Sequence, residues 1–251
     1  MRIVVTGGAG DLGSRVLAEL VHRGHDAVSA SRRSGVDLAT GHGLAEALDG
    51  AAAVVNCADD PRRGDAVTVG GARRLAEAVA ASAPPLHLVH ISIVGCDANP
   101  LRYYQRKAAA ESAIAQSGAR STVLRATQFH SLAARFARML TVGPITVSTG
   151  SLAFQPADVD WVAARLADLA SGPPPERAVR ATDVAGPGVL TVGEIAALVR
   201  QRAGRGAPRV LTVPPIGRTM RAFAERSNVP DPSAVETGGR TFAEWLAATP
   251  A

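Results

Sequence analysis

A glycine-rich turn directly after the first apolar run constrains the fold of this chain more than any other feature. Residues 2–6 read RIVVT, a compact run rich in β-branched side chains, and the glycines of TGGAGDLG follow at once over residues 6–13. Apolar residues then recur at helical spacing as far as Leu20, and residues 26–30 are strand-like again. A strand, a helix and a second strand within about 30 residues form a βαβ unit.

Strand-like and helical segments continue to alternate as far as Arg125. The expected helices cover residues 43–48, 67–81 and 101–116, and the expected strands cover residues 53–57, 86–92 and 121–125. Only residues 34–40 separate the second strand from the next helix, so a further strand there would shrink to about residues 36–38. This alternation predicts an α/β fold, a doubly wound parallel sheet with helices on both faces.

The pattern becomes looser after Arg125. The expected helices cover residues 129–140, 158–170, 218–226 and 241–248, with one more beginning at Thr191, and the expected strands cover residues 145–148, 178–182 and 209–213. Thr191 with Glu194 three residues later matches a capping box. Because no repeat or shift in composition marks an independent second domain, we expect one domain over residues 1–251, with a core over 1–127 and mixed core and cap over 128–251.

The glycine turn also predicts a ligand. Gly7, Gly10 and Gly13 are spaced three apart between a strand and a helix. Glycines there let the backbone turn sharply and approach a pyrophosphate, whose charge the first amides of the helix face. The flanking strand and helix supply the context that such a motif needs. We therefore predict a dinucleotide site, the alternative being a glycine turn without a ligand.

The end of the second strand indicates which dinucleotide binds. Residues 29–35 read SASRRSG, so Ser31, Arg32 and Arg33 stand where a carboxylate usually holds a free ribose diol. With no carboxylate at that position to repel a 2′-phosphate, NADP(H) is favoured over NAD(H). The alternative is that the two arginines are solvated loop charges.

Composition and charge argue against several other classes of function. The net charge is +5, but the arginines are scattered and aromatic residues make up only 4% of the chain, so we do not expect nucleic-acid binding. No apolar stretch approaches the roughly 18 residues of a membrane-spanning helix, and no signal peptide precedes the first strand. Two cysteines and six histidines have no disulfide or metal-binding spacing. We expect a cytoplasmic protein, monomeric or homodimeric, without membrane or metal, acting on a small molecule.

Residues 103–107, YYQRK, hold both tyrosines and the only lysine of the chain. Tyr103 and Lys107 are four residues apart on an expected helix and so lie on one face. An ammonium beside a phenol lowers the pKa of the phenol and makes it a usable acid or base near neutrality. Ser92 ends the preceding strand, where its hydroxyl could polarise a substrate oxygen. Tyr104 is the alternative to Tyr103 if the helix is rotated, and all of these residues could instead serve only packing or capping.

With these residues in place, the chain resembles the short-chain dehydrogenase/reductase superfamily, most closely its atypical, NmrA-like members. The resemblance covers nearly the whole length. It rests on VTGGAGDLG (5–13), SRRSGVDL (31–38), VVNCADDP (54–61), HISIVG (90–95), YYQRKAAAE (103–111), VLRATQFH (123–130) and QPADVDWVA (155–163).

The resemblance implies a Rossmann-type core that binds NADP(H) across the strand ends, and it assigns residues to the parts of the cofactor. It implies Gly7, Gly10, Asp11, Leu12 and Gly13 at the pyrophosphate, Ser31 and Arg32 at the 2′-phosphate, Asp37 and Leu38 at the adenine, Cys57, Ala58 and Asp59 along the cofactor, and Ala126, Thr127 and Gln128 at the nicotinamide. Tyr103, Lys107 and Ser92 match the catalytic residues of the family, and Lys107 would also contact the cofactor.

The chain departs from the family at Thr68, where active members commonly carry Asn and atypical members often carry Asp. The loop between Ser92 and Tyr103 is also shorter than in many active dehydrogenases. We expect an NADPH-dependent oxidoreductase that transfers hydride to a small carbonyl, enone or quinone-like substrate. The alternatives are a non-catalytic NADP(H)-binding regulatory or sensor protein and a nucleotide-sugar epimerase or dehydratase.

Overall fold

The computed structural model describes residues 1–60 and 63–249, which fold into two compact units. The first unit consists of Met1–Ser92, Arg102–Arg125 and Val162–Ala181, and the second of Ile93–Leu101, Ala126–Trp161 and Thr182–Ala251. At Ala126, close to the expected end of the core, the chain passes from the first unit to the second. Residues 162–181 then belong to the first unit again. The single-domain organisation of residues 1–251 stays a prediction.

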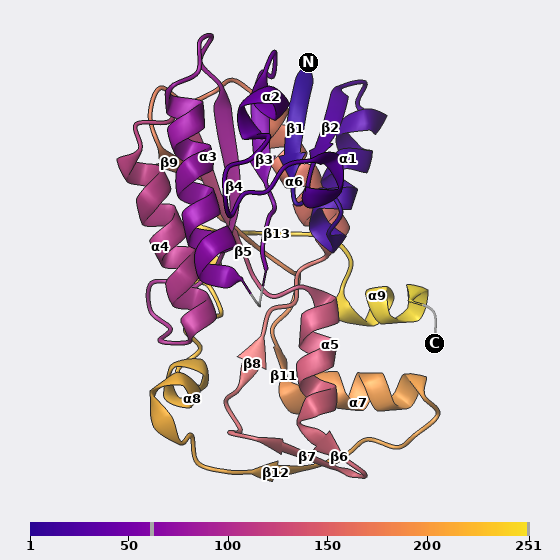
Figure 1. The fold of residues 1–251 in the computed structure, drawn as a ribbon. Coiled ribbons are helices and arrows are strands. Elements are labelled where there is room, and N and C mark those ends of the chain that lie inside the picture. The colour runs from indigo at the N-terminus through magenta and orange to yellow at the C-terminus, as the bar shows by residue number, and fades with distance from the viewer. Residues whose placement is uncertain (61–62, 250–251) are drawn as a thin grey trace. The chain divides into compact units, whose positions relative to one another are not determined.

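The first unit is built on a parallel sheet with strand order β2-β1-β3-β4-β5 (Figure 1). The strands are β1 (Arg2–Thr6), β2 (Asp26–Ala30), β3 (Ala53–Asn56), β4 (His87–Ile93) and β5 (Ser121–Ala126), and the short β9 (Val179–Arg180) pairs in parallel with β5. All residues of β3, β4 and β5 are buried, as expected for a parallel sheet covered on both faces.

Helices cover both faces of this sheet (Figure 1). They are α2 (Leu44–Leu48), α3 (Gly70–Ala80) and α4 (Arg102–Gln116) on one face and α1 (Asp11–His22) and α6 (Val159–Ser171) on the other. Val4, Val54 and Leu88 from three neighbouring strands pack with Leu75 of α3 and Ile114 of α4 in one core. The doubly wound α/β arrangement predicted from the alternation is confirmed.

Two segments of the first unit differ from the sequence prediction. No strand forms at residues 36–38: a 3₁₀ turn, η1 (Arg32–Ser34), follows β2, and Asp37 only makes an isolated bridge to His42. The left-handed Gly35 (φ 84°) ends this turn and redirects the chain before a strand can begin. The helix expected over residues 67–81 begins earlier, with a π-helical segment, η2 (Asp65–Val69), that leads into α3.

The second unit combines helices with short strands. Its helices are α5 (His130–Met139), α7 (Val192–Arg202), α8 (Gly217–Ala224) and α9 (Phe242–Ala248), and η3 (Pro232–Ala234) is a 3₁₀ turn. Its strands are β6 (Thr141–Val142), β7 (Ile145–Ser148) and β12 (Arg209–Thr212) in one sheet, β8 (Ala153–Phe154) with β11 (Leu190–Thr191), and β10 (Asp183–Ala185) with β13 (Val235–Thr237). The core of this unit contains Ala133, Phe154, Ile195 and Phe242.

The boundaries of the second unit follow local signals where those are strong. Thr191 accepts a hydrogen bond from the Glu194 amide, and the carboxylate of Glu194 accepts one from the Thr191 amide, so the predicted capping box is confirmed. The strand expected over residues 178–182 is instead two short strands, β9 and β10. Within the described residues, no helix combines the length and apolar character needed to cross a membrane.

Candidate functional site

The glycine turn lies between the end of β1 and the start of α1, and its geometry requires glycine. Gly7 adopts φ +71°, and a Cβ there would lie 2.8 Å from the backbone of Ala58. A Cβ on Gly13 would collide with the carbonyl oxygen of Gly7. Gly10 precedes α1 and offers no side-chain cap, so the first amides of the helix are not occupied by a capping side chain. The turn therefore forms a narrow backbone cradle at a helix N-terminus, which suits a phosphate group.

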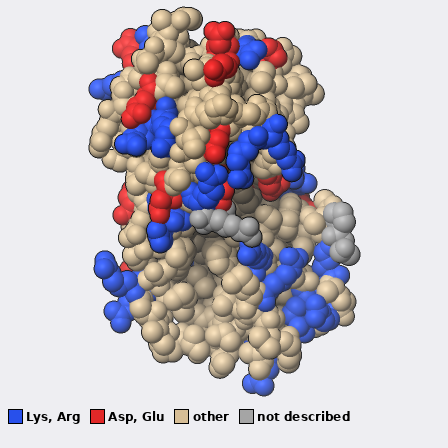
Figure 2. Space-filling view, in the orientation of Figure 1, with Lys and Arg blue, Asp and Glu red and all other residues tan. Residues whose placement is uncertain are grey.

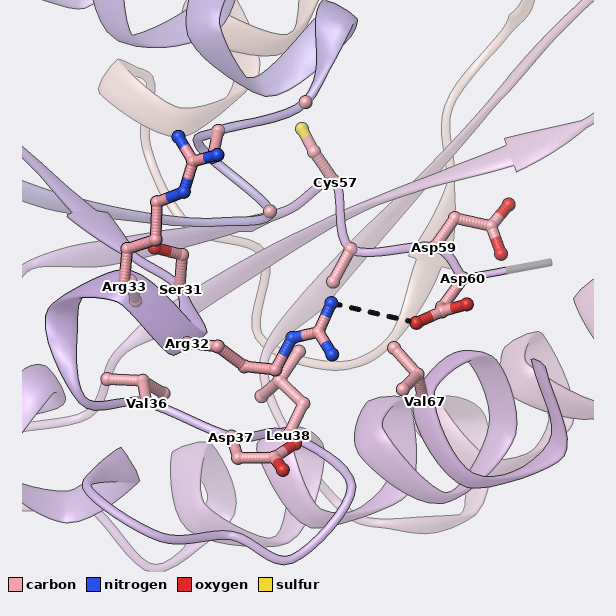
Figure 3. A pocket seen from close by; sticks show the side chains of 15 residues that line it. Ser31, Arg32, Arg33, Val36, Asp37, Leu38, Cys57, Asp59, Asp60 and Val67 are labelled. Carbon is pink, nitrogen blue, oxygen red and sulfur yellow. Dashed lines mark ion pairs between the residues drawn. The ribbon is translucent and has the colours of Figure 1, made fainter. Parts of the chain in front are cut away.

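A pocket of about 290 Å³ opens beside this turn, at the carboxyl ends of β1, β2 and β3 (Figure 3). Ten of the predicted cofactor residues line it, namely Gly7, Gly10, Ser31, Arg32, Arg33, Asp37, Leu38, Cys57, Ala58 and Asp59. Sequence reasoning missed the other lining residues, Ala9, Ala30, Val36, Asp60 and Val67. They are small, apolar or charged neighbours of predicted residues, and no spacing rule singles them out.

The remaining predicted cofactor residues lie elsewhere. Asp11 is exposed at the start of α1 and pairs with Arg15 at 3.1 Å, and the next two residues, Leu12 and Gly13, are buried in the helix. Three further residues, Ala126, Thr127 and Gln128, belong to the second unit and are buried there. The Thr127 hydroxyl donates to the carbonyl oxygen of Gln155, and the Gln128 side-chain oxygen accepts from Asn228.

Two carboxylates that line the pocket, Asp60 and Asp37, are paired with arginines. Arg32 extends its guanidinium toward Asp60, with 3.9 Å between Nη2 and Oδ2 (Figure 3). Arg63 lies 3.5 Å from Asp37, whose pKa is lowered by the backbone amide of Ala39 and by Arg63. The sequence predicted no carboxylate that would compete with a 2′-phosphate for Arg32, and this prediction was incomplete. Asp60, from the loop after β3, lies beside Arg32 at the end of β2. Any anion that approaches Arg32 must compete with Asp60 for it.

Asp59 connects this pocket to the predicted catalytic pair. Its carboxylate lies 3.5 Å from the Lys107 Nζ and accepts a hydrogen bond from the Thr68 hydroxyl at 2.7 Å. Lys107 is buried, with 4% of its side chain exposed, and also donates to the carbonyl oxygen of Ile91. Of the two tyrosines, Tyr103 is the one that Lys107 faces, with the Nζ 5.8 Å from the centre of its ring, while Tyr104 is buried and packs edge-to-face against Tyr103.

The pKa of Tyr103 shifts in the direction opposite to the prediction. Burial raises the pKa of the phenol well above its usual value, and the charge and hydrogen bond of Asp59 raise it further. Burial also acts to raise the pKa of Asp59, but Lys107 and the bonds from Thr68 and Tyr103 outweigh it and hold that pKa below its usual range. The expected lowering of the Tyr103 pKa was wrong because the phenol is buried and because Lys107 is paired with a carboxylate, neither of which the spacing of Tyr103 and Lys107 reveals.

A ladder of polar side chains lies under the site. The residues Thr6, Asn56 and His90 are in register on β1, β3 and β4. The Thr6 hydroxyl and the Ala58 amide donate to the Asn56 side-chain oxygen, and Asn56 Nδ2 lies 3.1 Å from His90 Nδ1. His90 Nδ1 therefore accepts, and the proton of the neutral ring is on Nε2, which has no hydrogen-bond partner among the described residues.

His90 is held neutral by its surroundings. Burial, together with the positive charge of Lys107, lowers the pKa of His90 to about 3. Asn56 and His90 were missed in the sequence, although two polar residues at matching ends of neighbouring apolar strands are a detectable signal. The other predicted residue of this strand, Ser92, is buried in β4.

Cys57 lines the pocket as a neutral thiol. Burial raises the pKa of Cys57 to about 12, which makes it a poor nucleophile. Across residues 1–60 and 63–249, no group of three or more His, Cys, Asp or Glu side chains is placed to hold a metal ion.

No family model and no curated protein matches the chain. Solved structures do. An NADPH-dependent quinone oxidoreductase from Escherichia coli, complexed with NADPH, is similar with a TM-score of 0.74 and 18% identity over 98% of each chain. A nucleoside-diphosphate-sugar epimerase from Staphylococcus aureus reaches a TM-score of 0.75 at 14% identity, over 98% of this chain and 99% of the other. A short-chain dehydrogenase/reductase superfamily protein from Agrobacterium tumefaciens, with bound NAD, reaches 0.71 at 18% identity, over 98% and 95%. The chain therefore has the Rossmann-type fold predicted from its resemblance to that superfamily.

Proposed function

We propose that this protein binds NADP(H) and is an oxidoreductase that reduces a small carbonyl, enone or quinone-like substrate. The observation that carries the proposal is the position of Asp59, which lines the pocket beside the glycine turn and also pairs with Lys107, the cation that faces Tyr103. One residue thus connects a cradle for a dinucleotide with a proton donor. Of the three structures compared above, one contains NADPH, one contains NAD and one is of a nucleoside-diphosphate-sugar epimerase. This supports a nucleotide cofactor in general.

The residues of the pocket fit the parts of such a cofactor. The turn from Gly7 to Gly13 and the first amides of α1 would hold the pyrophosphate. Arg32, with Ser31 and Arg33, would bind the 2′-phosphate, and Asp37 with Leu38 would lie at the adenine end. Bound NADPH would supply the hydride. We also propose that Ala126, Thr127 and Gln128 contribute to the nicotinamide end.

The proton would come from Tyr103. Its phenol is protonated at neutral pH because its pKa is raised, so it can donate to a substrate oxygen that gains negative charge. Lys107, 5.8 Å from the centre of the Tyr103 ring, would bind the ribose hydroxyls of the cofactor. Ser92 would orient the substrate oxygen.

Calorimetric titration with NADPH and, separately, NADH tests the proposal. We expect NADPH to bind at least about tenfold more tightly than NADH, since only NADPH offers Arg32 a 2′-phosphate. Arg32→Ala should remove that preference, whereas Arg73→Ala, on the exposed face of α3 and paired with Glu77, should leave it unchanged. Failure of both nucleotides to bind the wild-type protein would refute the proposal.

A non-catalytic NADP(H) sensor is the second candidate, and one observation favours it. Lys107 is paired with Asp59, and Thr68, at the position where active members of the resembled family commonly carry Asn, bonds the same carboxylate. Tight NADPH binding without oxidation of NADPH by any of a panel of quinones, enones and aldehydes would support the sensor. An epimerase would instead return its cofactor unchanged after converting a nucleotide sugar.

A further inference from the structure

Asp59 receives hydrogen bonds from two separate elements of the first unit. Thr68 lies on η2, and Tyr103 and Lys107 lie on α4. The Thr68 hydroxyl binds Oδ1 at 2.7 Å, and the Lys107 Nζ lies 3.5 Å from Oδ2. The neighbouring Asp60 points toward Arg32, while the carboxylate of Asp59 points away from it (Figure 3). The two adjacent aspartates thus serve different groups.

The cations beside Tyr103 on α4 are paired with carboxylates. Lys107 is the facing cation, and its charge is balanced by Asp59. Arg106, one turn from Tyr103 on α4, is engaged by Asp65 through two hydrogen bonds. His90 on β4 is neutral, and the thiol of Cys57, directly after β3, is protonated. A phenolate at Tyr103 would therefore have no unbalanced cation beside it among these groups.

Thr68 fixes the orientation of that carboxylate. Its side chain is buried, and its hydroxyl donates to Asp59 rather than to backbone. With one oxygen held by Thr68, the other oxygen of the Asp59 carboxylate is directed to Lys107, so the pair of Asp59 and Lys107 is a fixed part of the site. The residue that departs from the resembled family is thus an element of the same network.

We infer that Asp59 is a positioning residue: it holds and balances the Lys107 ammonium that faces the Tyr103 ring, so that this cation does not stabilise a phenolate at Tyr103. The consequence for chemistry rests on the proposed function: the phenol stays protonated at neutral pH, which is the form that reduction of a carbonyl or quinone requires.

The chain offers a direct test, because it contains only two tyrosines. Tyrosinate formation can be followed by ultraviolet absorbance as the pH is raised, and Tyr103→Phe identifies which transition belongs to Tyr103. In Asp59→Asn, Lys107 is no longer balanced, so we expect Tyr103 to ionise at least about one pH unit lower than in the wild type. Asp65→Asn is the matched control. It also removes the charge of an aspartate that is paired with cations of α4, here Arg102 and Arg106, and it should leave the pH of the Tyr103 transition unchanged.

Two further variants keep the inference falsifiable. Asp59→Glu retains the negative charge. In this variant, Tyr103 should ionise at a pH closer to the wild-type value than it does in Asp59→Asn. If Asp59→Asn does not fold, as judged by circular dichroism, Asp59→Ser removes the same charge with the same expectation. Superimposable Tyr103 transitions in the wild type and in a folded, neutral variant at position 59 would overturn the inference.

The titration needs neither cofactor nor substrate, so its outcome is separate from that of the proposed function. If NADPH fails to bind while the Tyr103 transition shifts, the function is wrong and the role of Asp59 stands. If a reducible substrate is found, kcat/KM should fall with rising pH at a lower pH in Asp59→Asn than in the wild type, since reduction needs the protonated phenol. Coincident pH profiles would contradict the inference in the active enzyme.

Discussion

For Tyr103, the sequence predicted the position beside Lys107 correctly but predicted the direction of the pKa shift wrongly. Its spacing from Lys107 places both on one face of α4, as expected, and they lie close together. The sign of its pKa shift depends on burial and on Asp59, which follows a different strand. Burial of the phenol and the charge of Asp59 raise the Tyr103 pKa by more than the neighbouring Lys107 lowers it. Residue-scale predictions of chemistry therefore need the tertiary environment.

Replacing Tyr103 by Phe should separate catalysis from binding. The change removes the hydroxyl that would donate the proton but keeps the ring, so we expect turnover of a quinone or aldehyde with NADPH to fall by at least about 100-fold. NADPH affinity, measured by calorimetry, should change little. The companion variant Tyr104→Phe alters the buried neighbour and should keep most of the activity. Equal rates for the wild type and Tyr103→Phe would exclude Tyr103 as the proton donor.

The elements of the first unit follow their local signals closely. The expected bounds of β1 and β2 match the structure, because a compact β-branched run and a glycine turn act locally. Residues 36–38 do not form a strand, since the left-handed glycine at position 35 and the bridge from Asp37 to His42 fold the segment back. The π-helical start of η2 has no signal that hydrophobic periodicity would detect.

The packing of α1 against the glycine turn gives an element-scale prediction. In Gly13→Ala the new Cβ would collide with the carbonyl oxygen of Gly7, whereas in Gly10→Ala the Cβ would lie 3.2 Å from that oxygen. We expect Gly13→Ala to lower the free energy of unfolding by about 1–3 kcal/mol and to weaken NADPH binding. Gly10→Ala should cost less stability. Urea unfolding followed by circular dichroism compares the two, and equal stability of both variants would contradict the close approach of α1 to the turn.

On the scale of the whole molecule, part of the positive charge has a structural role. Over the part of the second unit that holds α7, basic side chains gather on the face drawn in Figure 2. Arg138, Arg200 and Arg205 line a cavity of about 200 Å³ there. Arg200 donates hydrogen bonds to the carbonyl oxygens of Gly143 and Gly206. Arg200 lies in the last turn of α7 and Arg138 in the last turn of α5, where a cation interacts favourably with the negative end of the helix dipole. These arginines stabilise helix ends and connecting turns.

Buried neutral histidines predict the acid stability of the protein. Burial lowers the pKa values of His87, His90 and His130, that of His90 to about 3. A folded state that binds protons less readily than the unfolded state is stable above the unfolded pKa, near 6.5, and loses stability as the pH falls from there toward the folded pKa. The Tm should therefore fall steadily between about pH 6.5 and pH 4, before most carboxylates titrate.

Thermal unfolding followed by circular dichroism at a series of pH values measures this dependence. His22 and His25 are not buried, so His22→Gln serves as a control that should keep the wild-type pH dependence. His90→Asn should flatten part of the slope. A Tm that stays constant from pH 7 to pH 5 would contradict the inference that the buried histidines are neutral in the fold.

The sequence by itself determined the order of the elements, the doubly wound architecture, the glycine turn and most of the residues that line the pocket. These follow from periodicity, β-branched runs and glycine requirements, which act over a few neighbouring residues. Only the tertiary structure decided that Asp59 joins Thr68, Tyr103 and Lys107, that Asp60 faces Arg32, and that Asn56 binds His90. These contacts join different elements, and their energies depend on distance and burial in space, which no local pattern in the chain records.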